Sequence, residues 1–383
     1  MIGRKYLISL AGLLLCWPLL TWTIWRGSHD QAEDLTSRFT VEENWPQLPQ
    51  GRSIGDVTSF SVDDEDNVWL LHRPRTIDDE GIAQAAPPIL KLNSEGLILD
   101  AWGGEGAQFE WPQREHFIHV DSEGSVWIGG NYCPGRNLPR LKPLHDDQII
   151  KFRRDKTFAL QIGRASRSKG NADKLNLHWP SDAVVHAPTN ELYVADGYGN
   201  HRVIVLDADS GEFKRMWGAF GNVPEGVAEC PKRGAFGTAL EMFNPFVDVD
   251  KMERAQQFST PHAIRVSHDG VVYVADRGNR RVQTFTTDGE FIGQIVRNEG
   301  LFAHNLALSH DRDQRYLYVG GGGKIAVYVR SSLELIGDIH LPGLIGYGFD
   351  HHIATDSKGN LYVAGVFAGL VKLTFQGSFD SRP

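Results

Sequence analysis

Cysteine is scarce in this chain of 383 residues, which has three in all, so a scaffold built on many disulfides is excluded. Positive charge is not in excess either, because 39 Lys and Arg stand against 48 Asp and Glu and the net charge is −9. Such a balance offers no basic footprint for a phosphate backbone, and we expect no nucleic-acid partner. Helical periodicity is also missing outside one N-terminal segment.

That segment is a long apolar run. Residues 6–25 form 20 positions without a formal charge, which is long enough to cross a bilayer as a helix. Arg4 and Lys5 precede the run, and acidic residues follow it at Asp30, Glu33 and Asp34. This asymmetry predicts a transmembrane signal anchor over residues 1–30, with the remainder exported to the periplasm or the extracellular space. The alternative is a cleaved signal peptide and a secreted protein, although no small-x-small site follows the run.

Beyond residue 45 one unit recurs along the chain. Segments 180–218 and 261–296 both alternate apolar and polar residues with period 2, which is typical of half-buried strands. Four further copies cover residues 55–103, 115–163, 303–339 and 350–375. A unit of about 40 residues with four short strands is one propeller blade. The sequence therefore predicts an all-β, six-bladed NHL-type β-propeller over residues 31–376, followed by a short tail at 377–383.

The sixth copy ends near Phe375 and lacks an outer strand. Residues 38–45 (RFTVEENW) alternate in the same way and precede the first copy. We expect them to supply the missing strand, which would close the ring and remove an exposed edge.

Two further patterns concern the frame of the fold. The register places Cys133 and Cys230 on one face of the ring in neighbouring blades, so either a disulfide or two free thiols is possible. A trio of polar residues recurs in two copies, which indicates a turn-forming role: Asp196, Asn200 and Arg202, and Asp276, Asn279 and Arg281.

Histidines open the first strand in the even-numbered copies. In this register His116 belongs to the second copy, His262 to the fourth and His351 to the sixth. Alternate blades of a six-fold ring are related by about 120°, so three imidazoles would converge on the axis, and three His with an open position is a catalytic zinc arrangement. His304 in the fifth copy breaks the alternation and favours the plainer interpretation that His suits this strand position.

Two turns at the same mouth carry further candidate residues. The turn from Asp196 to Asn200 is one residue longer than its counterpart in the next copy and presents Tyr198 between two glycines. Arg73 begins the equivalent turn of the first copy. With zinc as Lewis acid, Tyr198 would be the general base and Arg73 would neutralise developing negative charge. Each could instead be an ordinary surface residue.

Two insertions extend the same face. Residues 219–257 join the third copy to the fourth without clear strand patterning, and residues 134–147 interrupt the second copy. Long connections of this kind read as a lid or substrate wall, or as loose surface loops.

These motifs together resemble the peptidyl-α-hydroxyglycine α-amidating lyase family. The resembling segments are EHFI at His116, PHAI at His262, HHIA at His351, DGYGNHR at Tyr198 and HRP at Arg73. The resemblance implies a six-bladed NHL propeller, zinc held by the three histidines, and Tyr198 and Arg73 as catalytic residues. It implies cleavage of the carbinolamide C–N bond of a small peptide-like α-hydroxy amide, giving an amide and glyoxylate.

Some positions depart from the family pattern. His352 stands where the family has an Asp associated with a structural calcium ion, which weighs against Ca²⁺ here. Phe349 and Asp350 replace a Met-Pro pair, and Gly199 replaces a Cys. Two other functions remain open: a non-catalytic propeller that binds a peptide, glycan or protein, and a metal-dependent lactonase, whose acidic ring is not found here.

Overall fold

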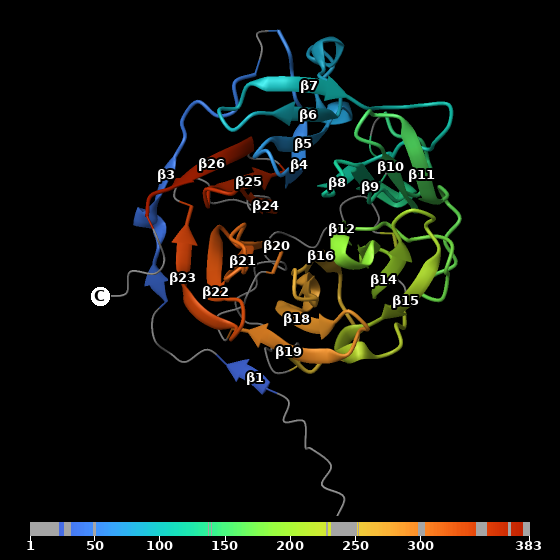
Figure 1. Cartoon of the computed structure of the whole chain (residues 1–383). Coiled ribbons are helices and arrows are strands. Elements are labelled where there is room, and N and C mark those ends of the chain that lie inside the picture. The colour runs from blue at the N-terminus through green and yellow to red at the C-terminus, as the bar shows by residue number, and fades with distance from the viewer. Residues whose placement is uncertain are drawn as a thin grey trace, which may run out of the picture.

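Six β-sheets stand around a common axis in the computed structural model of this chain (Figure 1). The residues described are 23–26, 32–48, 51–136, 138, 140–226, 229–230, 251, 253–297, 303–341, 351–366 and 369–377. The predicted six-bladed all-β propeller is confirmed.

The first three blades each consist of four strands in chain order. Blade 1 contains β4 (Asp56–Val62), β5 (Val68–Arg73), β6 (Ile89–Leu92) and β7 (Ile98–Trp102). Blade 2 contains β8 (Glu115–Val120), β9 (Val126–Gly130), β10 (Gln148–Phe152) and β11 (Phe158–Gly163). Blade 3 contains β12 (Asp182–His186), β13 (Glu191–Asp196), β14 (Arg202–Asp207) and β15 (Phe213–Trp217).

The other three blades follow the same plan with additions from the N-terminal segment. Blade 4 contains β16 (Pro261–Val266), β17 (Val271–Asp276), β18 (Arg281–Thr286) and β19 (Phe291–Val296). Blade 5 contains β20 (Asn305–Leu308), β21 (Tyr316–Gly321), β22 (Lys324–Val329) and β23 (Glu334–His340). Blade 6 contains β24 (His352–Thr355), β25 (Leu361–Gly365), β26 (Gly369–Phe375) and β3 (Phe39–Val41).

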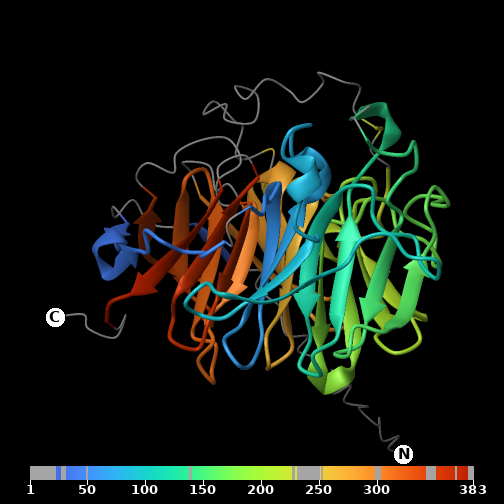
Figure 2. The ribbon, with the colours of Figure 1, turned by 90° about the horizontal axis from the view of Figure 1, so that it is seen from above.

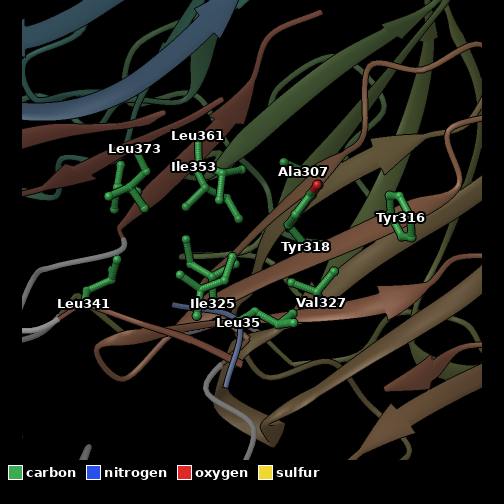
Figure 3. Close-up of a cluster of buried hydrophobic side chains, with 12 residues drawn as sticks. Leu35, Ala307, Tyr316, Tyr318, Ile325, Val327, Leu341, Ile353, Leu361 and Leu373 are labelled. Atoms are coloured by element: carbon green, nitrogen blue, oxygen red, sulfur yellow. The ribbon is translucent and has the colours of Figure 1, made fainter. Parts of the chain in front are cut away.

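Neighbouring blades bury both faces of each sheet, which explains the apolar second strands. In β17, Val272 and Val274 pack with Val203 of blade 3. The alternate residues Tyr273 and Ala275 pack with blade 5 instead. Successive side chains of a strand point to opposite faces, so one strand serves two interfaces. Figure 3 shows the corresponding cluster between blades 5 and 6.

The ring is closed by β3, as predicted. This strand pairs antiparallel with β26, with Val41 opposite Leu373 and Phe39 opposite Phe375. The rings of Phe39 and Phe375 lie 5.1 Å apart between centroids, so the closing contact is apolar as well as hydrogen-bonded. Covering β26 in this way leaves blade 6 with four strands.

The N-terminal segment also edges two other blades. Strand β1 (Thr23–Arg26) pairs in parallel with β19, and β2 (Glu33–Asp34) pairs in parallel with β23. Of the predicted anchor over residues 1–30, residues 1–22 and 27–30 lie outside the described residues, and Thr23–Arg26 is extended rather than helical. Within the described ranges, no helix has both the length and the apolar character needed to span a membrane.

The recurring polar trio is structural, as predicted. Asp196 and Arg202 form an ion pair of 2.9 Å, and Asp276 and Arg281 form one of 2.8 Å, with all four side chains fully buried. The Arg202 guanidinium also donates to the backbone carbonyl groups of residues 171, 173 and 176. Each pair is therefore a buried ion pair that stabilises the turn between two strands of its blade.

Of the two predicted states of Cys133 and Cys230, the structure has the disulfide. Cys133 precedes the short 3₁₀ helix η4 (Pro134–Arg136) of blade 2, and Cys230 follows blade 3. In Figure 2 the short helices of blade 1 and the insertion of blade 2 project from the same face of the ring. The bond therefore joins two neighbouring blades at the face that carries these insertions.

Candidate functional site

Two of the three predicted histidine ligands lie at β-bulges of the innermost strands. Pairing of β8 with β9 shifts register between Glu115 and Phe117, so His116 has no partner across the ladder. Pairing of β16 with β17 shifts in the same way between Pro261 and Ala263 and leaves His262 unpaired. A bulge bends its strand and re-aims the extra side chain, here toward the channel axis.

The structure brings the three histidines together. One nitrogen from each of His116, His262 and His351 lies within 4.8 Å of the others. The ring centroids are 5.2 Å apart for His116 and His262, 4.9 Å for His116 and His351, and 5.2 Å for His262 and His351. The nearly equal sides of this triangle follow from the placement of the residues on alternate blades.

Backbone carbonyl groups of the other three blades orient these rings. His116 Nδ1 lies 2.8 Å from Ser181 O, and His351 Nδ1 lies 2.8 Å from Thr58 O. His262 Nδ1 lies 2.6 Å from His304 O. A carbonyl oxygen only accepts, so each Nδ1 carries the proton and each Nε2 of the neutral ring is an acceptor.

These carbonyl groups explain why a histidine, His304, also stands in this register in the fifth copy. Thr58, Ser181 and His304 occupy, in blades 1, 3 and 5, the register that the three histidines occupy in blades 2, 4 and 6. Odd blades thus contribute an acceptor from the backbone, and even blades contribute the imidazole. The identity of the side chain at 304 is immaterial to this hydrogen bond.

The triad is suited to hold a divalent transition metal. Burial lowers the pKa of His116 well below 6.5, and the neighbouring imidazoles of His351 and His262 lower it further. Burial also lowers the pKa of His262 well below 6.5, with the charge of Arg277 as the next cause. Burial also lowers the pKa of His351, with Arg73 as the next cause. Neutral imidazoles with Nδ1 held by an outer acceptor are the usual form of zinc-ligating His. Zn–N bonds of about 2.0–2.1 Å would draw the three nitrogens closer together than they lie here.

Tyr198 reaches the triad from the turn between β13 and β14. Its Oη lies 3.1 Å from His116 Nε2 and 2.9 Å from His262 Nε2. Arg277 Nη1 lies 3.2 Å from the same oxygen, and its guanidinium stands over the phenol ring at 5.1 Å from the centroid. Arg277 therefore places a positive charge beside Tyr198 Oη and over its ring.

The glycines on either side of Tyr198 are required by close packing. A Cβ on Gly197 would lie 1.9 Å from Pro261 O, and one on Gly199 would lie 1.9 Å from His178 Cδ2. The turn is therefore pressed against blade 4 on one side and against the segment before blade 3 on the other. Only glycine fits at these two positions, and their tight seat fixes where Tyr198 points.

Arg73 is buried rather than solvated. It is 2% exposed, and its Nε donates to Glu115 O at 2.8 Å. Neither Nη1 nor Nη2 has a hydrogen-bond partner among the described residues. Burial, and next the charge of Arg114, lower its pKa from the usual value. Two unpaired N–H groups on a buried guanidinium are complementary to an anionic group of a ligand.

A pocket of about 550 Å³ adjoins Arg73 between blades 1 and 2. Its other lining residues include Arg75, Ile77, Arg114 and Leu138. Leu138 belongs to the 134–147 insertion, which thereby forms a wall of the pocket. Much of the 219–257 linker, like Phe349 and Asp350, lies outside the described residues.

Sequence reasoning missed Arg277 and the three carbonyl acceptors. Arg277 begins the short turn of blade 4 that corresponds to the turn of Tyr198 in blade 3, so the alignment of the two turns held the signal. The carbonyl groups carry no signature, because any residue supplies one.

Comparison with known proteins defines the class of the fold first. The model for the NHL repeat matches residues 177–206 and 258–285, which contain the first two strands of blades 3 and 4 and all but the last residue of the third. These two segments of the six-bladed ring therefore match the NHL-repeat pattern. A solved streptogramin B lyase covers 90% of this chain and is covered completely by it, at 13% identity and a TM-score of 0.50, which is a likeness of fold alone.

The curated relatives are more specific. The chain is 25% identical over 378 residues to peptidyl-glycine alpha-amidating monooxygenase B of Xenopus laevis, covering 89% of this chain and 36% of that protein. It is 25% identical over 275 residues to peptidyl-alpha-hydroxyglycine alpha-amidating lyase 1 of Drosophila melanogaster, covering 68% and 43%. NHL repeat-containing protein 3 of Mus musculus is 26% identical over 296 residues, covering 74% and 71%.

These matches support the resemblance that the motifs carry: the chain is similar, at low identity, to proteins named for α-amidating lyase activity. It spans about a third of the length of the monooxygenases that it matches.

Proposed function

We propose that this chain is a zinc-dependent carbon–nitrogen lyase that cleaves the carbinolamide of a peptide-like α-hydroxyglycine. One observation carries the proposal: three neutral imidazoles from alternate blades meet within 4.8 Å, and the Tyr198 phenol is hydrogen-bonded among them. A metal with a phenol at its open side is suited to removing a proton from a hydroxyl group. The names of the relatives point to the same reaction.

When bound, zinc would supply Lewis acidity to an oxygen of the substrate. Tyr198, as phenolate, would take the proton of the α-hydroxyl group, and Arg277 would hold Tyr198 in place and favour its charged form. The C–O bond then gains double-bond character while the C–N bond breaks, and the electron pair leaves with nitrogen. The phenol returns its proton to that nitrogen, so the products are an amide and glyoxylate and the enzyme is regenerated.

Arg73 would hold the anionic end of the substrate. Its two unpaired Nη groups match the two oxygens of a carboxylate, and a buried pair of this kind is strong because water does not compete for it. This contact would also keep the hydroxyl group oriented toward Tyr198.

The test has two stages. Purified protein should contain one zinc ion per chain by elemental analysis, and it should release glyoxylate from α-hydroxyhippurate. Metal without turnover would restrict the proposal to a binding site, and the absence of both would refute it.

A second function is favoured by the match to NHL repeat-containing protein 3, which extends over most of both chains. In that case the propeller is a non-catalytic module that binds a peptide, glycan or protein partner. Protein that gains no activity when supplied with zinc, yet retains a partner of one of these kinds, would favour this function.

We also propose that the propeller is exported and remains attached to the membrane through the N-terminal apolar run that precedes Thr23, since Thr23–Arg26 pairs with β19 in the structure. The disulfide between Cys133 and Cys230 supports export, because such bonds persist in oxidising compartments. Fractionation of cells and N-terminal sequencing of the mature protein test the anchor: a start beyond residue 25 in the soluble fraction would replace it with a cleaved signal peptide.

A further inference from the structure

The central channel continues beyond the histidine triad and contains a separate cavity, called the channel chamber here. Further along the innermost strands lies a cavity of about 200 Å³, bordered by residues of all six blades. Asp182 is the one acidic residue among those that line it, and Arg265 is the one Arg or Lys. The formal charges that border this chamber therefore come from one pair of side chains, Asp182 and Arg265.

The two charges are in direct contact. Arg265 Nη1 lies 2.5 Å from Asp182 Oδ2, and the side chain of Asp182 is 3% exposed. Backbone N–H groups complete the coordination of the carboxylate, from Ile264 at 3.1 Å and from Ala183 at 3.0 Å. Both carboxylate oxygens are thus occupied by protein donors.

The same guanidinium reaches a third blade. Arg265 Nη2 lies 3.2 Å from His352 Nε2, while Phe60 N–H approaches His352 Nδ1 at 3.3 Å. His352 is 4% exposed, and each of its ring nitrogens faces an N–H group, of which a neutral imidazole accepts one. Asp182 belongs to blade 3, Arg265 to blade 4 and His352 to blade 6.

This arrangement does not fit the calcium ion that the family resemblance implies. Calcium takes six to eight oxygen ligands at about 2.3–2.6 Å. The position that would add a carboxylate is His352, and the carboxylate that is present already binds a cation. An ion placed beside Arg265 would also meet like charge.

We propose that Arg265 is the built-in cation of this channel, in place of a metal ion. The guanidinium neutralises Asp182, contacts His352 and so ties three blades together without calcium. The chain would then hold one metal ion only, at the triad, and the frame around the triad would keep its stability when calcium is removed. Arg265 is three residues from His262, and His352 adjoins His351. The contacts of Arg265 therefore stabilise two of the three blades that carry the triad.

Calcium dependence of the whole purified chain tests the proposal. Elemental analysis should find no calcium, and the melting temperature should be the same in excess EGTA and in millimolar calcium. Stoichiometric calcium, or a lower melting temperature in EGTA, would overturn the proposal. Neither result depends on whether the protein is a lyase.

Two variants make the test sharper. Arg265→Met should lower the melting temperature by several degrees, because it leaves Asp182 buried without a partner, and adding Asp182→Asn should recover most of the loss. Combining Arg265→Ala with His352→Asp removes the cation and adds a carboxylate, so the melting temperature should become dependent on calcium.

Arg297→Met is the matched control, since Arg297 pairs with Asp338 outside the channel at 2.7 Å. It should destabilise the protein and confer no response to calcium. If the melting temperatures of the Arg297 variant and of the Arg265→Ala, His352→Asp variant responded equally to calcium, the response would not arise from the channel.

Discussion

The phenol oxygen of Tyr198 lies 2.9 Å from His262 Nε2, so the proposed general base is in contact with a proposed metal ligand. Two residues from neighbouring blades are thereby united in one site. In the proposed reaction Tyr198 removes a proton, and the metal ion that His262 would help to hold lowers the barrier to that removal.

Replacing Tyr198 with Phe should therefore separate catalysis from metal binding. The variant keeps the ring and loses only the hydroxyl group, so we expect glyoxylate release to fall by about 10²- to 10⁴-fold while the zinc content stays unchanged. Steady-state kinetics and elemental analysis on the same preparation check both parts. Unchanged turnover would assign the proton transfer to another group.

The alternation of imidazole and carbonyl around the ring gives a matched pair of histidine variants. His116→Ala removes a proposed ligand and should abolish stoichiometric zinc. His304→Ala retains the backbone carbonyl that accepts from His262, so zinc should remain at one ion per chain. Equal loss of zinc in both variants would show that the side chain of His304 participates.

Gly197 offers a test of how Tyr198 is positioned. A Cβ at this position would lie 1.9 Å from Pro261 O, so Gly197→Ala must displace the turn. We expect kcat to fall by about 10²-fold, as misplacement of a catalytic group by about 1 Å can cost. The zinc content should be retained, and a crystal structure of the variant should show Tyr198 Oη further from His262. Wild-type kcat in this variant would mean that the turn tolerates the shift.

A histidine outside the site should make stability depend on pH. Burial lowers the pKa of His72 from 6.5 to about 4, and its ring accepts from Gly55 N and donates to Pro87 O. Between these pH values the unfolded chain binds a proton that the folded chain does not. The free energy of unfolding should therefore fall as the pH falls from 6.5 toward 4, with His72 accounting for about 3 kcal/mol at the lower end.

The variant His72→Gln keeps one donor and one acceptor but does not titrate. Urea unfolding of both proteins across this pH range should show a shallower decline for the variant. Parallel curves would indicate that His72 is not the group responsible.

The repeat register was sufficient to predict the ring and the meeting of the three histidines. Because blades recur at a near-constant length, residues in one register of the sequence occupy one level of the channel. The closing strand at Phe39–Val41 was predictable for a related reason: the sixth copy was one strand short.

What lay beyond prediction depends on contacts between blades. The bulges at His116 and His262 arise from strand pairing, and the carbonyl groups that hold the rings are independent of side-chain identity. Arg73 is buried by its packing in the fold, and Arg265 contacts Asp182 and His352 of two other blades. The repeat pattern does not predict contacts between residues of different blades. A lone Arg in a sequence could equally have been an exposed residue.

The pairing of β3 with β26 has a consequence for biosynthesis. The strand that completes the last blade leaves the ribosome before blade 1 is made, and its partner β26 follows the strands of the first five blades. During translation the blades can form only an open arc, and the seam is sealed after Phe375 has been made. A nascent chain that stops before β26 has no partner for β3 in this seam, so synthesis of β26 is itself a condition for closing the ring.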